Sequence, residues 1–258
     1  SFATAAGALG GGFMVKNIQA AGHTTLFAYK SIIGLYAVSG LMLLFCFVRL
    51  SKAVEPSVVV SEVKKIFGLH KSKKIIVKLS SLFALDAFAG GFVIQSMIAY
   101  WFHLRYGADT MTIGTLFFFA NILAGVSALL AVPLSKRFGL VNTMVFTHLP
   151  SNVLLILVPF MPTLPLAIAL LLARFAISQM DVPTRQAYTL SVVAPDERSA
   201  ASGVTAIARS IGAALSPSIA GLLIGIPGFI TAPFVVAGAL KITYDLLLFR
   251  EFKSVKPN

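Results

Sequence analysis

The chain is divided into long apolar segments by short loops, and its basic residues gather in every second loop. A helix of about 20 residues is long enough to cross a hydrocarbon core of ~30 Å. Eight segments meet this length: residues 2–22, 26–49, 78–103, 112–134, 141–161, 165–188, 200–225 and 229–249. The pattern predicts an all-α integral membrane protein with lipid around most of its length.

The composition agrees with this prediction. Hydrophobic residues make up 57% of the chain and charged residues 12%, whereas a soluble domain carries about 25% charged residues. A net charge of +12 could indicate a nucleic-acid-binding surface, but the basic residues stand beside the apolar segments. We therefore expect the lipid bilayer, and not nucleic acid, to be the partner of these charges.

The basic loops predict the topology. Lysines and arginines are concentrated between the second and third segments, and again in alternate loops and in the tail, at Lys64, Lys71, Lys136, Arg198 and Lys253 among others. Such loops lie on the cytoplasmic side. Both ends of an even number of spans are then cytoplasmic, and we expect a plasma or inner membrane protein.

Motifs for catalysis or metal binding are missing from the sequence. Cys46 is the single cysteine, and no His-x-x-x-His, paired-cysteine or Gly-x-Ser-x-Gly motif occurs. We expect neither a metal nor a cofactor, and no enzyme activity. An intramembrane hydrolase or acyltransferase remains an alternative, against which stands the lack of a nucleophile–base pair.

A short internal echo indicates a repeat. Gly7–Gly12 is similar to residues 212–217, about 205 residues later, and parallel repeats of this kind occur in two-halved transporters. The partner of the third segment would then precede Ser1, so we expect the chain to be part of a longer protein with twelve helices. Chance similarity is the alternative, because Gly and Ala are common in membrane helices.

Residues 174–222 carry a more specific pattern. An arginine is followed by Pro-Thr-Arg-Gln-Ala, then by Ala-Pro-Asp-Glu-Arg-Ser-Ala-Ala, and then by Ala-Arg-Ser-Ile-Gly-Ala-Ala-Leu-Ser-Pro. This resembles the tenth and eleventh helices of the major facilitator superfamily and the turn between them. A second stretch, residues 132–141, resembles the family's signature loop at Leu134, Arg137 and Gly139, although Lys136 stands where the family has an acidic residue.

The resemblance covers the family's fifth to twelfth helices. It implies two six-helix lobes around a central cavity, with residues 1–49 as the last two helices of the first lobe, 50–77 as a basic cytoplasmic linker and 78–258 as the second lobe and a short tail. Glu62–Leu69 and Ser72–Leu79 have apolar positions at helical spacing. This part of the linker is either an amphipathic helix on the inner membrane face or a solvated loop.

Polar residues inside membrane spans are costly and are functional candidates. The resemblance places the family's helices seven, eight, ten and eleven around the cavity, which favours a substrate and proton pathway of Asp86, Gln95, Asn121, Arg174, Gln179 and Arg209. It leaves His148, Asn152, Lys241 and Asp245 on outer helices, where Lys241 and Asp245, four residues apart, would pair on their own helix. The alternative for the favoured set is a group of structural ion pairs that never contact substrate.

Two further sets of residues are predicted to take part in conformational change. Asp181, Arg185, Arg198 and Arg137 are predicted to form a cytoplasmic gate, with Asp181 and Arg185 also spaced as an i,i+4 pair across Pro183. Gly212, Pro217 and Gly221 are predicted to be a packing seam and hinge, because small residues allow close helix contact and proline bends membrane helices.

These observations predict a secondary active transporter that moves a small organic solute by alternating access. Asp86 is the expected proton carrier, since a carboxyl group at depth can bind and release a proton, and Arg174 is expected either to pair with Asp86 or to anchor an anionic substrate. We expect export and a monomer of the full-length chain. A non-transporting sensor or assembly protein of the same fold is the alternative.

Overall fold

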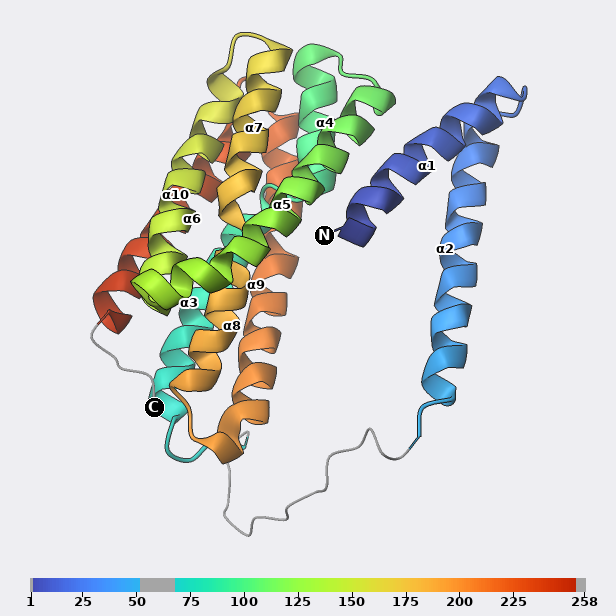
Figure 1. The fold of residues 1–258 in the computed structure, drawn as a ribbon. Coiled ribbons are helices and arrows are strands. Elements are labelled where there is room, and N and C mark those ends of the chain that lie inside the picture. The colour runs from blue at the N-terminus through green and yellow to red at the C-terminus, as the bar shows by residue number, and fades with distance from the viewer. Residues whose placement is uncertain (1, 52–67, 254–258) are drawn as a thin grey trace.

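The structure, a computed structural model, describes residues 2–51 and 68–253. All regular elements in these ranges are helices (Figure 1). They are α1 Phe2–Ala20, α2 Thr25–Val48, α3 Lys73–Gly91, α4 Gln95–Tyr106, α5 Thr110–Phe138, α6 Leu140–Leu157, α7 Leu164–Ser178, α8 Asp181–Ser191, α9 Arg198–Gly225 and α10 Ala232–Phe252, with short 3-10 helices η2 Val158–Phe160 and η3 Pro195–Glu197. The predicted all-α class is confirmed.

Seven helical segments in the described ranges are long and apolar enough to cross a membrane. They correspond to the predicted spans from the second onward. The first predicted span is also helical and forms α1, but it is not among the seven, because glycines and the polar residues Lys16, Asn17 and Gln19 lower its hydropathy. That α1 crosses the membrane stays a prediction.

Two of the predicted spans are broken helices. The third divides into α3 and α4 around Phe92–Ile94, directly after Gly90 and Gly91, where two glycines weaken the helix. The sixth divides into α7 and α8 at Gln179–Met180. Pro183 explains this second break, because a proline has no N–H for the carbonyl four residues earlier, here that of Gln179, and its ring crowds that carbonyl.

The start of the third span differs from the prediction. Helix α3 begins at Lys73 and not at Lys78, so residues 73–77 of the predicted linker are helical. The other predicted amphipathic segment, Glu62–Leu69, lies almost entirely outside the described residues. The carboxylate of Glu197 accepts hydrogen bonds from the backbone N–H groups of His70, Lys71 at 2.8 Å and Ser72 at 2.9 Å. These bonds anchor the backbone directly before α3, and the bond from Ser72 gives an acceptor to the N–H of the N-cap residue of the helix.

Helices α3 to α10 pack together as one bundle, here called the α3–α10 bundle. Within it α3 packs against α9 and α10, α6 packs against α7 and α10, and α5 packs against α7. Its interior holds two apolar clusters, one around Trp101 and Phe234 and the other around Tyr188 and Tyr244. The polar site described below lies between the helices that carry these clusters.

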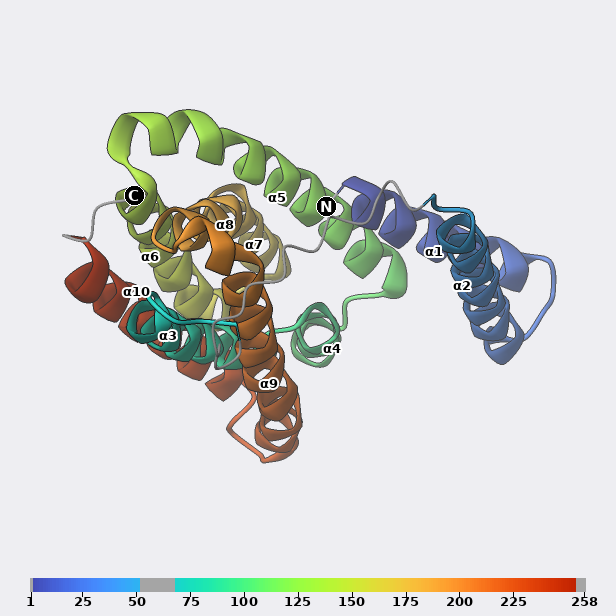
Figure 2. The same cartoon turned by 90° about the horizontal axis from the view of Figure 1, so that it is seen from below.

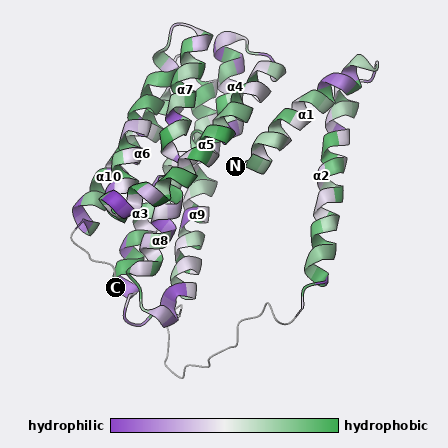
Figure 3. Cartoon of the chain, viewed as in Figure 1, coloured by the Kyte–Doolittle hydropathy of each residue, from purple (hydrophilic) through white to green (hydrophobic). Residues whose placement is uncertain are grey.

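Helices α1 and α2 stand beside this bundle. Both ribbon views place α1 next to α5, and α2 on the far side of α1 (Figures 1 and 2). The ring of Phe2 lies against Gly125 of α5, where a side chain would occupy the same space. Helix α2 is hydrophobic along most of its length (Figure 3), yet among its residues only Ala28 is buried in the described structure.

Candidate functional site

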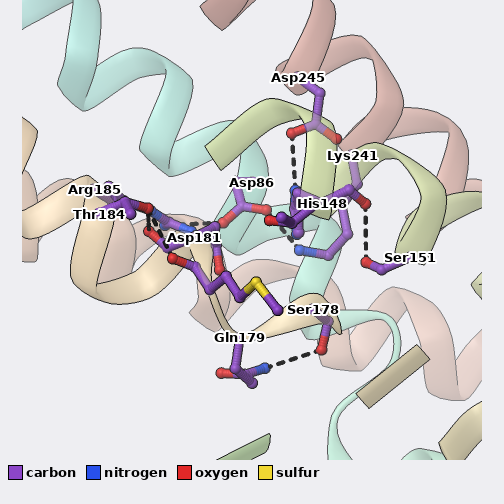
Figure 4. Close-up of polar contacts among 12 residues, drawn as sticks. Asp86, His148, Ser151, Ser178, Gln179, Asp181, Thr184, Arg185, Lys241 and Asp245 are labelled. Atoms are coloured by element: carbon purple, nitrogen blue, oxygen red, sulfur yellow. Dashed lines mark hydrogen bonds and ion pairs between the residues drawn. The ribbon is translucent and has the colours of Figure 1, made fainter. Parts of the chain in front are cut away.

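A group of ionisable side chains from four helices meets inside the α3–α10 bundle (Figure 4). Asp86 of α3 is its centre and is 4% exposed. The Lys241 ammonium of α10 donates to Asp86 Oδ1 at 2.6 Å, and Nη1 of Arg185 in α8 lies 3.0 Å from Asp86 Oδ2. Asp86 is therefore held between two cations from helices that are distant in the sequence.

Arg185 links Asp86 to a second carboxylate. Its other terminal nitrogen pairs with Asp181, one helical turn earlier, as the i,i+4 spacing predicted. The guanidinium carbon also lies 5.2 Å from the centre of the Phe83 ring and 5.9 Å from that of Tyr244. These aromatic faces pack around the cation and contribute cation–π attraction.

The α6 side of the group is a hydrogen-bonded triad. Nδ1 of His148 lies 2.8 Å from Asp245 Oδ1, and the Asn152 amide donates to Asp245 Oδ2 at 2.8 Å. All three side chains are buried. We call Asp86, His148, Asn152, Asp181, Arg185, Lys241 and Asp245 together the Asp86 cluster.

The cluster corrects one sequence prediction. Lys241 and Asp245 do not pair with each other on α10 as expected: Lys241 reaches Asp86, and Asp245 reaches His148 and Asn152. The packing of α10 against both α3 and α6 brings partners that are closer and buried. Asp86 is likewise not isolated, because two cations pair with it.

Arg174 of α7 stands next to the cluster. It is 8% exposed and lies within electrostatic range of Asp86. Its guanidinium carbon is 5.1 Å from the centre of the Phe175 ring, and within the described ranges its Nε has no hydrogen-bond partner. The ions paired with Asp86 are Arg185 and Lys241, so Arg174 adds a positive charge at a longer distance.

The remaining pathway candidates lie apart from one another. Gln95 is exposed and lines a pocket between α1, α4 and α5. Asn121 donates to the Phe117 carbonyl of its own helix at 2.7 Å, and the backbone N–H of Gln179 points to Ser127 Oγ at 3.3 Å. Arg209 of α9 lines a second pocket together with Arg185. The structure thus brings Asp86 and Arg209 near Arg185 and places Arg174 within electrostatic range of Asp86, and it places Gln95 and Asn121 elsewhere.

The predicted gate residues separate into two groups. Asp181 and Arg185 belong to the Asp86 cluster, whereas Arg137 and Arg198 are exposed. Arg137 lies over the Phe138 ring, and Arg198 donates to the Leu190 carbonyl at 3.2 Å.

The glycine seam on α9 lies at the α3 interface. A Cβ on Gly212 would meet the backbone carbonyl of Ala84, and one on Gly91 of α3 would meet Ser216 Oγ and, at 3.2 Å, Pro217 Cδ. At Gly221 the nearest atom, Met97 Cε, would be 3.8 Å away, which leaves room. Helix α9 continues through Pro217, and its role as a hinge stays a prediction.

Several residues that the sequence places outside the cavity lie at the centre of the Asp86 cluster or beside α3. The family resemblance puts on outer helices four residues that belong to the cluster: His148, Asn152, Lys241 and Asp245. The cost of burying ionisable side chains in lipid was the signal that could have retained them. His70 was also missed as the partner of Asp196, at 3.2 Å, because no spacing in the sequence connects them.

Comparison with known sequences places this architecture in a family. The sequence model of the Major Facilitator Superfamily matches the chain over residues 1–217 and again over residues 87–257. The chain is a multi-pass integral membrane protein, and it belongs to the Major Facilitator Superfamily.

A relative from Saccharomyces cerevisiae is named "Uncharacterized membrane protein YJR124C". It is 27% identical over 182 residues, which cover 70% of this chain and 40% of the yeast protein. The chain therefore matches less than half of that relative's length. No solved structure matches the chain.

Proposed function

We propose that this protein is part of a secondary active transporter that moves a small organic solute by alternating access, coupled to protons and in the direction of export. Members of the superfamily are generally membrane transporters, which supports the class. The proposed membrane is the plasma or inner membrane, with both chain ends in the cytoplasm and the full natural chain acting as a monomer. The basic loops support this orientation.

The observation that carries the proposal is the position of Asp86 between Lys241 and Arg185. Burying such ions costs several kcal/mol per ion before their attraction offsets it. A network that joins α3, α8 and α10 also responds when these helices move. In the described conformation the two cations keep Asp86 ionised, so a proton binds it only in a conformation where the helices that carry Lys241 and Arg185 have moved away. Protonation and helix movement are linked in this way.

The test of proton coupling is transport by the full natural chain in liposomes, with a panel of labelled sugars, amino acids, carboxylates and amines. We expect Asp86→Asn to abolish accumulation driven by a pH gradient while exchange of the same solute across the membrane continues, because asparagine cannot carry the proton. The variant also removes a partner from two buried ion pairs, so its folding is checked by circular dichroism, and loss of folding would assign Asp86 to structural ion pairs instead. Asp109→Asn is the matched control, since Asp109 caps α5 outside the cluster and asparagine caps equally well. Full accumulation by Asp86→Asn would refute coupling through Asp86.

Gating is tested separately through Arg185. An interaction shifts an equilibrium between two conformations only if its free energy differs between them. Spin labels across the proposed cytoplasmic mouth should therefore report a changed distance distribution in Arg185→Ala. An unchanged distribution with weakened solute binding would place Arg185 in the binding site and not in the gate.

A further inference from the structure

A pocket of about 370 Å³ opens between α3, α8 and α9. This volume is at the small end of the ~300–1,000 Å³ typical of ligand sites. Two arginines line it, Arg185 from α8 and Arg209 from α9, together with Phe83 of α3. We call it the Arg209 pocket.

Among the described residues, carboxylates compensate the charge of Arg185 but not that of Arg209. Arg185 is paired with both Asp86 and Asp181. Arg209 is half-buried and lies within electrostatic range of Arg185, which has the same sign. In the described part of the chain no carboxylate comes within ion-pair distance of Arg209. The pocket therefore has a cation that a bound anion would neutralise.

The sum of the formal charges around the pocket is also positive. Three buried carboxylates, Asp86, Asp181 and Asp245, face four cations, Arg174, Arg185, Lys241 and Arg209. With a neutral His148 the sum is one positive charge. Because charges of this kind interact strongly where water is partly excluded, the uncompensated charge favours an anion in the space next to Arg209.

Two of the four polar uncharged side chains that line the pocket can donate a hydrogen bond to a ligand. Thr189 and Thr205 donate their hydroxyls to carbonyls of their own helices, at 2.9 and 2.8 Å, so they have no proton left for a ligand. The side chains of Gln186 and Ser202 are exposed and have no hydrogen-bond partner among the described residues. Ser202 and Arg209 are seven residues apart, about two turns, and so share one face of α9.

We infer that the Arg209 pocket binds the anionic group of a small organic acid, and that organic anions are the substrate class. The carboxylate or phosphate group would contact Arg209 and the Gln186 and Ser202 donors, and the apolar part would lie against Phe83. This inference names the substrate class of the proposed transporter. The statement that the anion is the transported solute rests on the proposed function.

The first test measures ligand binding by the purified full natural chain in detergent. The probes are acetate, benzoate and succinate, each paired with its neutral amide, and inorganic phosphate. We expect at least one anion to raise the Tm while its amide does not. Arg209→Gln should weaken that anion about tenfold to a hundredfold, as loss of a charged hydrogen-bond donor does. Arg209→Lys should restore part of the affinity, because the charge returns without the planar fork.

The control is Arg105→Gln, which removes an exposed arginine from α4, a helix that does not line the pocket. We expect it to leave the anion effect unchanged. The inference is wrong if no anion stabilises the protein more than its amide, or if the effect persists in Arg209→Gln.

The second test needs no knowledge of the ligand. In a cysteine-free chain that includes Cys46→Ser, Ser202→Cys would be labelled with a negatively and a positively charged thiosulfonate of similar size. We expect the negative reagent to react faster, and Arg209→Gln to reduce the ratio of the two rates by about tenfold, the effect of one unit charge roughly 10 Å away on two reagents of opposite charge at intermediate dielectric. Equal rates would mean that no uncompensated positive charge acts at position 202, and would overturn the inference.

Failure of this inference and failure of the proposed function give different results. If neutral solutes are transported and no anion binds, the transporter proposal stands and the anion site is wrong. If anions bind through Arg209 but no solute crosses the membrane, the site stands and transport is wrong.

Discussion

Helix α2 and helix α3 differ in a way that separates hydrophobicity from burial. The most apolar stretch of α2 has a mean hydropathy of 2.3 and is 0% buried in the described structure, whereas the segment that contains α3 has a mean hydropathy of 1.6 and is 33% buried. In water the more hydrophobic helix would be the one inside. In lipid the apolar surface is already solvated, so the helices that pack inside are those with polar and small residues to place against a neighbour.

The same contrast extends to charge. Lys30 of α2 is exposed, while Lys241 of α10 is buried against Asp86. A charged residue inside the α3–α10 bundle therefore contributes to packing through an ion pair, whereas Lys30 of α2 has no ion pair among the described residues. Substitutions in matched pairs test how far this difference holds.

The largest difference in the free energy of unfolding is expected between substitutions of the two lysines. Lys241→Met keeps an apolar stem but leaves Asp86 with one cation fewer, and removing one partner of a buried ion pair costs about 3–5 kcal/mol. Lys30→Met should change the free energy of unfolding by less than about 0.5 kcal/mol, as exposed substitutions usually do. Unfolding by SDS, followed by circular dichroism, measures both. Equal losses would mean that burial in the α3–α10 bundle does not distinguish the two lysines, and the comparison would fail.

A smaller difference is expected between two helix starts. Glu197→Ala removes the acceptor for three backbone N–H groups before α3, and we expect a loss of about 2–3 kcal/mol. Thr24 caps α2 by accepting from Phe27 N at 3.3 Å in an exposed position, so Thr24→Ala should cost about 1 kcal/mol or less. Hydrogen exchange at residues 70–76 and 25–30 would locate each effect, and protection at 70–76 that survives Glu197→Ala would contradict the anchoring role.

The smallest difference in the free energy of unfolding is expected between two glycines, and the two effects have opposite signs. Gly212→Ala would place a Cβ against the Ala84 carbonyl and should destabilise by about 1–2 kcal/mol through overpacking. At Gly40 of α2 no atom lies within 4 Å of the new Cβ, so Gly40→Ala should stabilise by up to about 1 kcal/mol through helix propensity. The same SDS titration measures both, and a stabilising Gly212→Ala would show that α3 and α9 are packed more loosely than described.

The positions of most helices could be predicted from residue patterns, but the positions of the breaks within the spans could not. The span 165–188 is visible as an apolar run, but its division at Gln179 depends on Pro183, whose missing N–H and ring disturb the carbonyl four residues earlier. The break after Gly91 had a glycine pair as its signal. The start of α3 could not be placed, because its anchor, Glu197, is more than a hundred residues away in the chain.

The candidate site was predictable in part. The i,i+4 spacing of Asp181 and Arg185 was enough to predict their pair, since both lie on one helix face. The same rule predicted a Lys241–Asp245 pair that does not form, because neighbouring helices offer both residues other partners. Local spacing shows which pairs are possible within a helix, and the contacts between helices decide which of them form.

The sequence by itself determined that the chain crosses a membrane and belongs to its superfamily, since crossing lipid is a property of each run of about 20 residues and needs no neighbour. Only the tertiary structure decided that Asp86 lies between Arg185 and Lys241, and that Arg209 is left without a carboxylate in the described residues. The physical reason is that an ion pair between helices depends on distances of about 3 Å, set by how the helices rotate and pack. Hydrophobicity in lipid contains almost no information about that rotation.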